Sequence, residues 1–352
     1  MGRYVRALLP RLISSRPSLS VELYVADDAQ AAFARAWLAG SGIPSSRLTV
    51  RRIGELRQSA ADVFWYPWNH ADPLPAHGPV VVTIHDVAPL ALPDRRISAL
   101  FRNLLWRRRY ARAASNATIV LTDSEFSARE VERFLNVPRA RIRVAHLGPD
   151  APAIDGRGEP DLLAGADAAA LVRMGVSTPY ILTVGADDRR KDLDTAARAV
   201  ARLVAGGRRV SLVQAGNRRR RNAAAPHAWI VPLGYVEQPD LAALYRTAAA
   251  VAIPSIYEGF GLPLLEAMGH GAPVVCSRAA SLPEIGGTAP LWFEPGDDAG
   301  MAAALARVLD DPTVSAACRA AGLDQASLFS WEATATGTLA AFDDAAALAG
   351  DR

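Results

Sequence analysis

The sequence contains little cysteine, no long apolar run and no leader segment. Its cysteines, Cys276 and Cys318, cannot form a disulfide framework and lack metal-ligand spacing, so a disulfide-rich secreted domain and a zinc module are excluded. No apolar run reaches the roughly 18 residues that span a bilayer, and no basic segment followed by an apolar one opens the chain. These absences predict a cytoplasmic protein without a metal site.

The composition is that of an ordinary globular protein. Half of the 352 residues are hydrophobic, 21% are charged, and the formal net charge is +3. This length accommodates two domains of usual size. Because the small positive excess is concentrated in arginine clusters at 102–112 and 218–221, it favours an anionic ligand or a membrane surface as a partner.

Segments of strand character alternate with segments of helix character along the chain. The apolar runs 79–84, 119–122 and 180–184 are typical of strands, and helical stretches lie between such runs. This alternation predicts α/β domains with doubly wound parallel sheets. A shift toward proline, glycine and alanine indicates a linker. We expect a first domain over 1–150, a linker over 151–178, a second domain over 179–329 and a terminal helix over 330–352.

The segment 254–268 is the most informative part of the sequence. It follows a strand-like run, 249–253, and has the pattern of a glycine loop that leads into a helix. Gly259 and Gly261 permit a sharp turn and a close approach to a ligand, and Pro263 suits a first helical position. The free N–H groups and the positive dipole end at such a helix start favour phosphate.

Two carboxylates flank this expected phosphate site, Glu258 on the loop and Glu266 in the helix. Carboxylates repel phosphate but accept strong hydrogen bonds from hydroxyl groups. A phosphate site between two hydroxyl-binding groups fits a nucleotide sugar, which joins a sugar, a pyrophosphate and a ribose. The alternative is that Glu258 caps the helix and Glu266 is a solvated helix residue.

A second loop, 185–192, follows the first strand of the second domain and opens a helix. Ligands bind to such loops in α/β sheets. Arg190 and Lys191 on this loop would stabilise the negative charge that develops on a departing pyrophosphate. The alternative is a solvated basic turn.

The glycine loop with its two glutamates, which seven residues separate, resembles the signature of the retaining, nucleotide-sugar-dependent glycosyltransferases of family 4, or group 1. The resemblance covers nearly the whole chain. It implies the GT-B fold, in which two Rossmann-like domains face a cleft, and a terminal helix that returns to the first domain. It also implies that the second domain binds the donor through Arg190, Lys191, Glu258, Gly259, Phe260, Gly261, Leu262 and Glu266.

The resemblance further implies individual roles. Glu266 would bind ribose hydroxyls, while Glu258 and the amides of 260–262 would hold the sugar and the phosphates. No metal or other cofactor is expected, because fixed protein charges can stabilise the leaving group. Ala186 stands where the family often has arginine, so only part of the usual phosphate clamp is present, and Arg190 would compensate.

The stretch 83–90, Thr-Ile-His-Asp-Val-Ala-Pro-Leu, looks most like the mannosyltransferase-type members that build surface polysaccharides. GDP-mannose is therefore the expected donor. The expected acceptor is a hydroxyl of a glycan or of a lipid-linked glycan.

His85 ends a buried strand of the first domain and precedes Asp86. The resemblance places this histidine near the donor sugar and the attacking hydroxyl, which makes it a candidate catalytic residue beside Lys191 and Glu258. Adjacent strand side chains diverge, so the dipeptide does not by itself form a base and its orienting carboxylate. In such retaining enzymes a donor phosphate oxygen would accept the proton, with His85 holding sugar hydroxyls. The alternative is a histidine satisfied by backbone groups.

Gly234, Tyr235 and Val236 begin a segment to which the resemblance assigns recognition of the nucleotide base. The contacts would be made largely by backbone groups. An ordinary strand end is the alternative, and the residues alone leave both interpretations open.

The first domain is expected to lack one strand. Residues 1–14 have the apolar spacing of a helix, and Gly2-Arg3-Tyr4 resembles the end of the glycine-rich loop that precedes this helix in the family. The strand before that loop, which usually lies centrally in the sheet, is missing from this sequence. A misassigned start codon is the favoured explanation.

Residues 101–114 combine leucine, tryptophan and tyrosine with five arginines. This composition suits a helix on an anionic membrane, which would place the protein on the inner face of the cell membrane. The alternative is an ordinary amphipathic helix with Leu104, Leu105 and Ala111 facing inward. Neither this segment nor 218–221 has the context of a nucleic-acid site, so no nucleic-acid partner is expected.

Two other functions remain open. A sugar-phosphate synthase would have the same fold and would use a small sugar phosphate as its acceptor. A non-catalytic binding protein of this fold is supported by Ala186 and by the missing strand. The presence of His85, Lys191, Glu258 and Glu266 argues against this second alternative.

Overall fold

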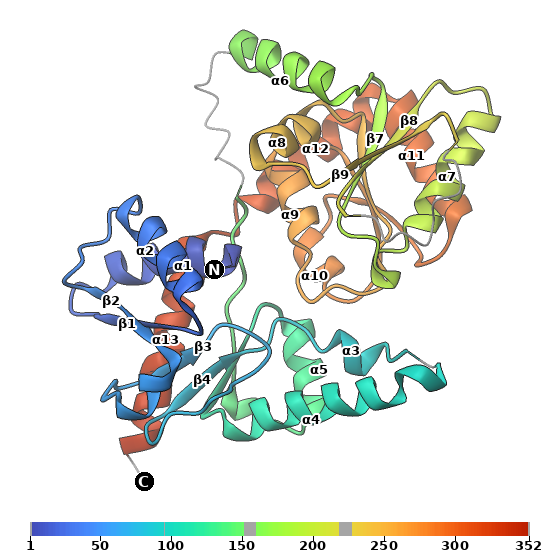
Figure 1. The fold of residues 1–352 in the computed structure, drawn as a ribbon. Helices are drawn as coiled ribbons and strands as arrows, with labels where there is room; N and C mark the ends of the chain where they lie inside the picture. Colours follow the sequence, from blue (N-terminus) through green and yellow to red (C-terminus); the bar gives the residue numbers. More distant parts are fainter. Residues whose placement is uncertain (1, 95, 151–159, 218–226, 351–352) are drawn as a thin grey trace. The chain divides into compact units, whose positions relative to one another are not determined.

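The structure is a computed structural model that describes residues 2–94, 96–150, 160–217 and 227–350. The arginine run 218–221 and part of the expected linker, 151–159, lie outside the described residues. The chain divides into two compact units (Figure 1), the first formed by Met1–Gly148 and Ser330–Arg352 and the second by Pro149–Phe329. Among the described helices, none is long and apolar enough to cross a membrane.

The first unit is built from parallel strands and the helices that connect them. The last helix of the chain, α13, belongs to this unit. Short 3-10 segments are labelled η. In chain order the elements are α1 (Arg3–Ser15), β1 (Val21–Val25), α2 (Asp28–Ala39), β2 (Leu48–Arg52), η1 (Ile53–Gln58), β3 (Phe64–Tyr66), β4 (Val80–Thr83), α3 (Ala88–Ala91), η2 (Ile97–Ala99), α4 (Leu100–Asn116), β5 (Ile119–Thr122), α5 (Glu125–Leu135), η3 (Arg139–Arg141), β6 (Ile142–Val144) and α13 (Trp331–Gly350).

The strands of the first unit form two separate parallel sheets. Strand β1 pairs with β2, and the other sheet has the order β3-β4-β5-β6. Within the described ranges no strand joins β1 to β3, so the sheet is interrupted where a central strand of a doubly wound domain would lie. This division agrees with the expectation that the sheet lacks one strand.

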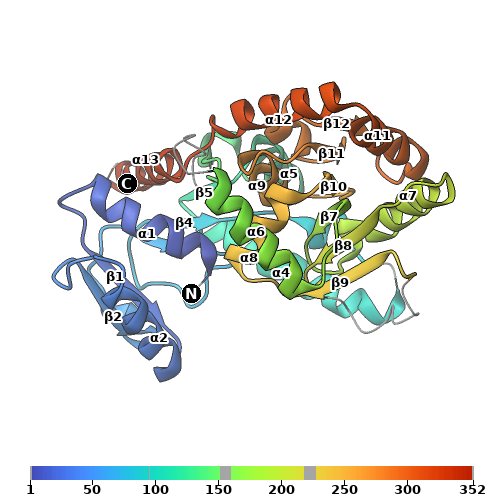
Figure 2. The same cartoon turned by 90° about the horizontal axis from the view of Figure 1, so that it is seen from above.

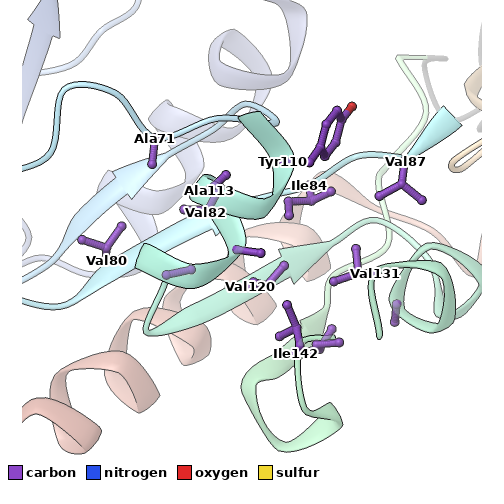
Figure 3. Packing of buried hydrophobic residues seen from close by; sticks show 14 of the residues in the cluster. Ala71, Val80, Val82, Ile84, Val87, Tyr110, Ala113, Val120, Val131 and Ile142 are labelled. Atoms are coloured by element: carbon purple, nitrogen blue, oxygen red, sulfur yellow. The ribbon is translucent and has the colours of Figure 1, made fainter. Parts of the chain in front are cut away.

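Strands β4 and β5 are buried on both faces, as parallel strands between helices usually are. Figure 3 shows Val82 from β4, the following Ile84 and Val120 from β5 in one hydrophobic cluster. Helix α4 closes this cluster with Tyr110, and helix α5 adds Val131. Close packing around β4 therefore fixes the position of the residues that follow this strand.

Helix α4 turns its small residues and a tyrosine toward the core. Tyr110 and Ala113 are buried, whereas Leu104 and Leu105 are 44% and 48% exposed and Ala111 is exposed. The interpretation that Leu104, Leu105 and Ala111 face inward is therefore wrong. The helix carries two apolar stripes, and periodicity alone does not indicate which of them packs on the sheet.

Helix α13 packs on α1 and along β4, β5 and β6. Gly337 permits a close approach to the end of β6, because a Cβ at this position would lie 3.1 Å from the Cβ of Ala145. On the outer side, Arg143 Nε lies 2.6 Å from Asp344 Oδ2. The last helix of the chain is thus an integral part of the first unit.

The second unit is built around one parallel sheet. Helix α6 precedes the sheet, and helices connect most of its strands. In chain order the elements are α6 (Pro160–Met174), β7 (Tyr180–Val184), η4 (Arg189–Lys191), α7 (Leu193–Ala205), β8 (Ser211–Ala215), β9 (Ile230–Gly234), α8 (Gln238–Thr247), β10 (Ala250–Ile253), α9 (Leu262–Gly269), β11 (Val274–Ser277), α10 (Leu282–Gly286), β12 (Leu291–Phe293), α11 (Asp298–Asp310) and α12 (Pro312–Ala326).

This sheet has the strand order β12-β11-β10-β7-β8-β9. The order reverses between β10 and β7, since successive strands are added beside β7 in one direction and beside β10 in the other. Helices α7 and α11 pack together on one face, and α8 and α9 cover the other (Figure 2). Ligands of open α/β sheets bind beyond the carboxyl ends of the strands at such a reversal.

Gly148 is the last residue of the first unit before the chain enters the second. A Cβ at Gly148 would collide with the backbone nitrogen of Trp331 and lie 2.6 Å from the backbone carbon of Ser330. Since neither backbone can move aside as a flexible side chain can, we expect Gly148→Ala to lower the free energy of unfolding of the first unit by about 1–3 kcal/mol. Denaturant titration followed by tryptophan fluorescence measures this change.

Gly54, in η1 of the same unit, supplies the matched control. A Cβ at Gly54 meets nothing within 4 Å, so Gly54→Ala should change the free energy of unfolding by less than about 0.5 kcal/mol. Equal stability of the two variants would refute the steric argument.

Candidate functional site

The two loops expected to bind the donor follow β7 and β10, the neighbouring strands at the reversal of the second sheet. Their backbones are joined directly, because the Ile256 amide donates to the Arg190 carbonyl oxygen at 2.8 Å. Two segments that lie far apart in the sequence therefore form one site.

Lys191 and Glu258 form a buried ion pair at this site. Lys191 Nζ lies 2.6 Å from Glu258 Oε1, and the two side chains are 16% and 11% exposed. The Ser255 hydroxyl donates to the same carboxylate oxygen at 2.7 Å. A buried charge is costly unless it is paired, so Glu258 stabilises the Lys191 ammonium group in its buried position. Glu258 is not a helix cap, because Gly261 occupies the N-cap position of α9.

Two glycines make room for the Lys191 side chain. Gly185, after β7, has φ 140°, and a Cβ there would lie 3.0 Å from Lys191 Cε. Gly216, after β8, has the same φ, and a Cβ there would collide with the Gly185 carbonyl oxygen. This backbone conformation also disfavours residues other than glycine. The strand ends approach each other, and Lys191 reaches the site, only with glycine at both positions.

Lys191 is the only lysine in the sequence, because the other basic residues counted among its 39 lysines and arginines are all arginine. A compact ammonium group on a flexible stem differs from a planar guanidinium group in shape and hydration. The position that uses lysine is also the one where a basic side chain is buried against a glycine backbone. This compositional signal could have singled out Lys191 without any motif.

Serine side chains at the end of β11 and at the start of α10 hold the glycine loop. The Ser281 hydroxyl lies 2.9 Å from the Glu258 carbonyl oxygen and 2.8 Å from the Phe260 carbonyl oxygen, to which it donates. The Ser277 hydroxyl donates to the Ser255 carbonyl oxygen. The sequence around Ser281 predicts only a turn, but in the fold this residue anchors the loop that carries Glu258.

The expected transition from glycine loop to helix is present. Gly261 has φ 102°, and a Cβ there would lie 2.8 Å from Leu282 Cδ2. Helix α9 then begins at Leu262. The Phe260 side chain is buried and packs edge-on against Phe329, with ring centroids 6.0 Å apart. Gly259 to Leu262 therefore offer backbone groups, rather than the Phe260 ring, to a ligand.

Glu266 is buried in α9 and is not a solvated helix residue. Its Oε2 accepts a hydrogen bond from the Tyr245 hydroxyl at 3.1 Å. The Tyr245 ring stacks on His270, with ring centroids 5.5 Å apart. Burial, with a further contribution from the charge of Arg246, lowers the pKa of His270 to about 4. The tyrosine thus holds the Glu266 carboxylate and a neutral histidine supports the tyrosine ring, and neither residue was found from the sequence.

The remaining donor-side residues are more exposed. Arg190 is 30% exposed, with its Nε 3.5 Å from Asp188 Oδ2. Tyr235 is 71% exposed and follows Gly234 at the end of β9, and Val236 is partly buried. Strand β8 separates β9 from β7, so Tyr235 and Val236 lie at the same sheet but not within the Lys191–Glu258 cluster.

The two cysteines do not belong to the Lys191–Glu258 cluster. Cys276 and Cys318 are buried, free thiols. Burial, reinforced by the negative charge of Glu258, raises the pKa of Cys276, so this thiol stays protonated. In the portion of the chain that the structure describes, no group of three or more His, Cys, Asp and Glu residues is arranged to hold a metal ion.

His85 belongs to the first unit and follows β4. Its Nδ1 lies 2.7 Å from Oδ2 of Asp123, which follows the neighbouring strand β5, and its Nε2 lies 3.1 Å from the Pro67 carbonyl oxygen. Both partners accept hydrogen bonds, so each ring nitrogen donates. This arrangement is that of an imidazolium paired with a carboxylate. Asp86 instead accepts from the Ala88 amide at 2.9 Å.

Burial is the largest influence on His85 and lowers the pKa of its imidazole. The Asp123 carboxylate raises the pKa through its charge and its hydrogen bond, and the Pro67 carbonyl oxygen and Asp86 raise it further. These contributions together exceed the effect of burial, so the pKa of His85 is raised. Tyr4 packs edge-on against the ring at 4.9 Å and stays neutral, because burial raises the pKa of its phenol.

Asp123 is the residue of this site that the sequence interpretation missed. In the sequence it stands only between a strand-like run and a helix-like segment. The signal that could have found it is topological, because residues after adjacent parallel strands meet at the same edge of a sheet. A histidine after β4 and an aspartate after β5 satisfy that condition.

Comparison with known proteins identifies the two halves of the chain. Residues 17–151 match the family described as Glycosyltransferase Family 4, and residues 178–311 match Glycosyl transferases group 1. The chain is 33% identical over 271 residues to the O-antigen chain mannosyltransferase B of Escherichia coli. The matched region covers 74% of this chain and 69% of that protein.

Solved structures share the fold. A sucrose-phosphate synthase from Thermosynechococcus elongatus superposes with a TM-score of 0.69 and 20% identity, covering 96% of this chain and 92% of that one. The Anabaena protein HepE, solved with UDP and glucose, has a TM-score of 0.68 and 17% identity, with 96% of this chain and 95% of that one covered.

These similarities agree with two Rossmann-like parallel-sheet domains and confirm the expected GT-B fold. The similarity to the Escherichia coli protein over 74% of this chain and the matches of both halves lead to the same assignment. The chain belongs to the family 4, or group 1, glycosyltransferases.

Proposed function

We propose that the protein transfers mannose from GDP-mannose to a hydroxyl of a glycan or lipid-linked glycan, with retention of the anomeric configuration. The acceptor oxygen forms a bond to the anomeric carbon while the bond from that carbon to the pyrophosphate breaks. The acceptor's proton passes to the departing phosphate oxygen. The name of the Escherichia coli relative, an O-antigen chain mannosyltransferase, supports mannose and a polysaccharide product.

The observation that carries this proposal is the buried Lys191–Glu258 pair at the reversal of the second sheet. When the donor binds, Lys191 neutralises the pyrophosphate, and the Glu258 carboxylate accepts hydrogen bonds from sugar hydroxyls. Arg190 lies on the same loop and adds positive charge. The backbone of 259–262 and the start of α9 favour the phosphates.

Glu266 binds the ribose in this proposal. A buried carboxylate that the Tyr245 hydroxyl orients accepts strong hydrogen bonds from hydroxyl groups such as those of a vicinal diol. The residues after β9, Tyr235 and Val236, contact the base. Because α9 carries Glu266 and begins at the phosphate loop, ribose and phosphate are recognised by one rigid element.

His85 acts through its positive charge and its backbone, and neither as a general base nor as a ring donor to sugar hydroxyls. Both of its ring nitrogens donate to acceptors, so the ring lacks a lone pair for a proton. Its positive charge and its backbone serve the sugar and the reacting centre instead. No protein base is needed, because the departing phosphate oxygen takes the proton.

The alternative with the same fold is a sugar-phosphate synthase. The sucrose-phosphate synthase structure from Thermosynechococcus elongatus shares the architecture, and its name states a sugar-phosphate product. The acceptor separates the two functions, because a synthase would use a small sugar phosphate.

A panel of nucleotide sugars tests the donor. Free nucleoside diphosphate is measured after incubation of GDP-mannose, UDP-glucose and related donors with wild type, Glu266→Ala and Tyr245→Phe. We expect turnover of GDP-mannose that falls roughly 10–100-fold in Glu266→Ala, which removes the carboxylate that binds the ribose. Turnover should fall about 3–10-fold in Tyr245→Phe, which keeps this carboxylate but removes the hydroxyl that orients it.

Glu237→Ala is the matched control. Glu237 is exposed and makes no side-chain cap for α8, so this variant should turn over donor at the wild-type rate. Turnover of another donor would replace GDP-mannose, and stimulation by a sugar phosphate alone would favour the synthase. Absence of both donor binding and turnover would reject the transferase function.

Acetylation of amines tests the role of Lys191, which is the only side-chain amine of the chain. GDP should slow acetylation of Lys191 several-fold, because the bound pyrophosphate contacts the Lys191 amine and shields it from the reagent. Acetylation of the N-terminal amine should be unaffected. Peptide mass spectrometry reads both sites in one sample. Lys191→Ala should lower transfer by about 10²–10³-fold. Equal acetylation with and without GDP would show that Lys191 does not contact the phosphates.

Asp123→Asn tests the charge state of His85. In wild type the pKa of His85 should exceed its ordinary value of about 6.5, and in the variant burial should bring it below that value. The stabilisation from the pair is fully present below about pH 6.5 and is lost as pH rises through the folded-state pKa. Transfer should fall over the same range. Histidine NMR titration, with the resonance identified in His85→Gln, measures both pKa values.

An unchanged His85 titration in Asp123→Asn would contradict this account. A wild-type His85 that titrates below about pH 6.5 would restore the general base as a possibility.

A further inference from the structure

The outer side of α4 and the 3-10 segment η2 before it carry a cluster of exposed apolar side chains. Of the eleven large hydrophobic residues that are exposed in the described chain, five lie within nine consecutive positions. They are Ile97 (87% exposed), Leu100 (60%), Phe101 (72%), Leu104 (44%) and Leu105 (48%). Isolated exposed residues are normal, but such a concentration marks an interaction surface.

These residues share one side of the helix. Phe101, Leu104, Leu105 and Arg108 follow the three- and four-residue spacing of a single helical face. Tyr110 lies on the opposite side and is buried in the core (Figure 3). Figure 1 shows the start of α4 extending past strands β3 and β4, so the apolar end of the face projects beyond the sheet.

Positive charge lies on and beside this face toward the end of the helix, with Arg108 and Arg112 on the face and Arg107 at its flank. The sequence from 95 to 122 contains seven arginines and no aspartate or glutamate. In the described part of the chain, Arg107 and Arg108 are exposed and have no carboxylate partner, while Arg112 lies 3.4 Å from Asp72. The apolar residues 97–105 and the arginines 107, 108 and 112 together form the α4 face.

We propose that the α4 face docks on an anionic phospholipid bilayer. Its apolar half enters the boundary between headgroups and acyl chains, and its arginines contact the headgroups. A second copy of the chain would bring the same arginines together and is disfavoured by charge. A nucleic acid would leave the apolar half exposed to water. An anionic bilayer satisfies both halves.

The docked helix is connected to the acceptor side of the first unit. Asn69 Nδ2 donates to the Tyr110 hydroxyl of α4 at 2.9 Å, and the His85 amide donates to Asn69 Oδ1 at 2.8 Å. Docking of α4 therefore sets the orientation of His85 toward the bilayer. This step rests on the proposed function, and it selects the lipid-linked acceptor over a soluble glycan.

Flotation with lipid vesicles tests the docking without requiring activity. The full chain is mixed with vesicles of phosphatidylglycerol and phosphatidylcholine or of phosphatidylcholine alone. We expect binding to the anionic vesicles, at least about tenfold weaker binding to the neutral ones, and weakening with salt, because screening reduces the arginine contribution.

Variants separate the two halves of the face. Ile97→Ser with Phe101→Ser should lower the bound-to-free ratio at least about tenfold, because it removes the inserted apolar groups. Arg107→Gln with Arg108→Gln should lower it roughly fivefold for each charge. The matched controls are Phe33→Ser and Arg35→Gln with Arg57→Gln, which change exposed residues elsewhere in the first unit and should bind as wild type.

The outcomes distinguish this proposal from the proposed function. Circular dichroism and GDP binding should be unchanged in every variant, and only transfer to a lipid-linked acceptor in vesicles should fall. Wild type that fails to float, or variants of the α4 face that float as wild type does, would overturn the docking. Self-association of wild type that the same variants abolish, without vesicle binding, would replace the bilayer by a second copy. Docking without donor turnover would reject the transferase function and leave the surface assignment intact.

Discussion

The site in the second unit depends on one buried ion pair, between Lys191 and Glu258. The ammonium group of a lysine side chain that is only 16% exposed requires a carboxylate beside it, and this requirement joins the loops after β7 and β10. The other contacts serve the same geometry. Ser255 and Ser281 fix the carboxylate and its loop, and Gly185 leaves space for the lysine stem. The site is therefore formed before any ligand arrives, which lowers the cost of binding an anion in a fixed position.

The first unit repeats this construction with different residues. His85 and Asp123 follow adjacent parallel strands, as Lys191 and Glu258 do, and each pair joins a cation to a carboxylate across two strand ends. A parallel sheet brings these ends together without any local sequence relation between them. In both units the fold thus converts distant residues into a charge pair at the edge where an α/β sheet meets its ligand.

This dependence on strand pairing explains which parts of the site could be predicted from the sequence. The loop 254–268 was found because its glycines, proline and carboxylates are close together, so local chemistry identified it. Asp123 and Tyr245 were missed because their partners lie on other elements, 38 and 21 residues away. The inward side of α4 was assigned wrongly for a related reason. The spacing of hydrophobic residues shows that a helix has an apolar stripe, but the sheet on which the helix packs decides which stripe is buried.

The alternation of strands and helices was enough to predict two α/β domains, because parallel strands buried on both faces are recognisable as short apolar runs. The helices α2 and α12 were not foreseen. Both are rich in alanine and have few large buried side chains, so their sequences carry little of the periodic signal from which an amphipathic helix is recognised.

Helix α13 leaves the ribosome after the whole second unit, although it packs on the first helix of the chain and on three strands of the first unit. The second unit lies wholly within Pro149–Phe329 and is available for folding before α13 has been synthesised. Domains usually fold in the order in which they are made. Here the unit made second is the first that can be completed, and the nascent N-terminal unit must wait, with the surface for helix α13 uncovered, until that helix has been synthesised.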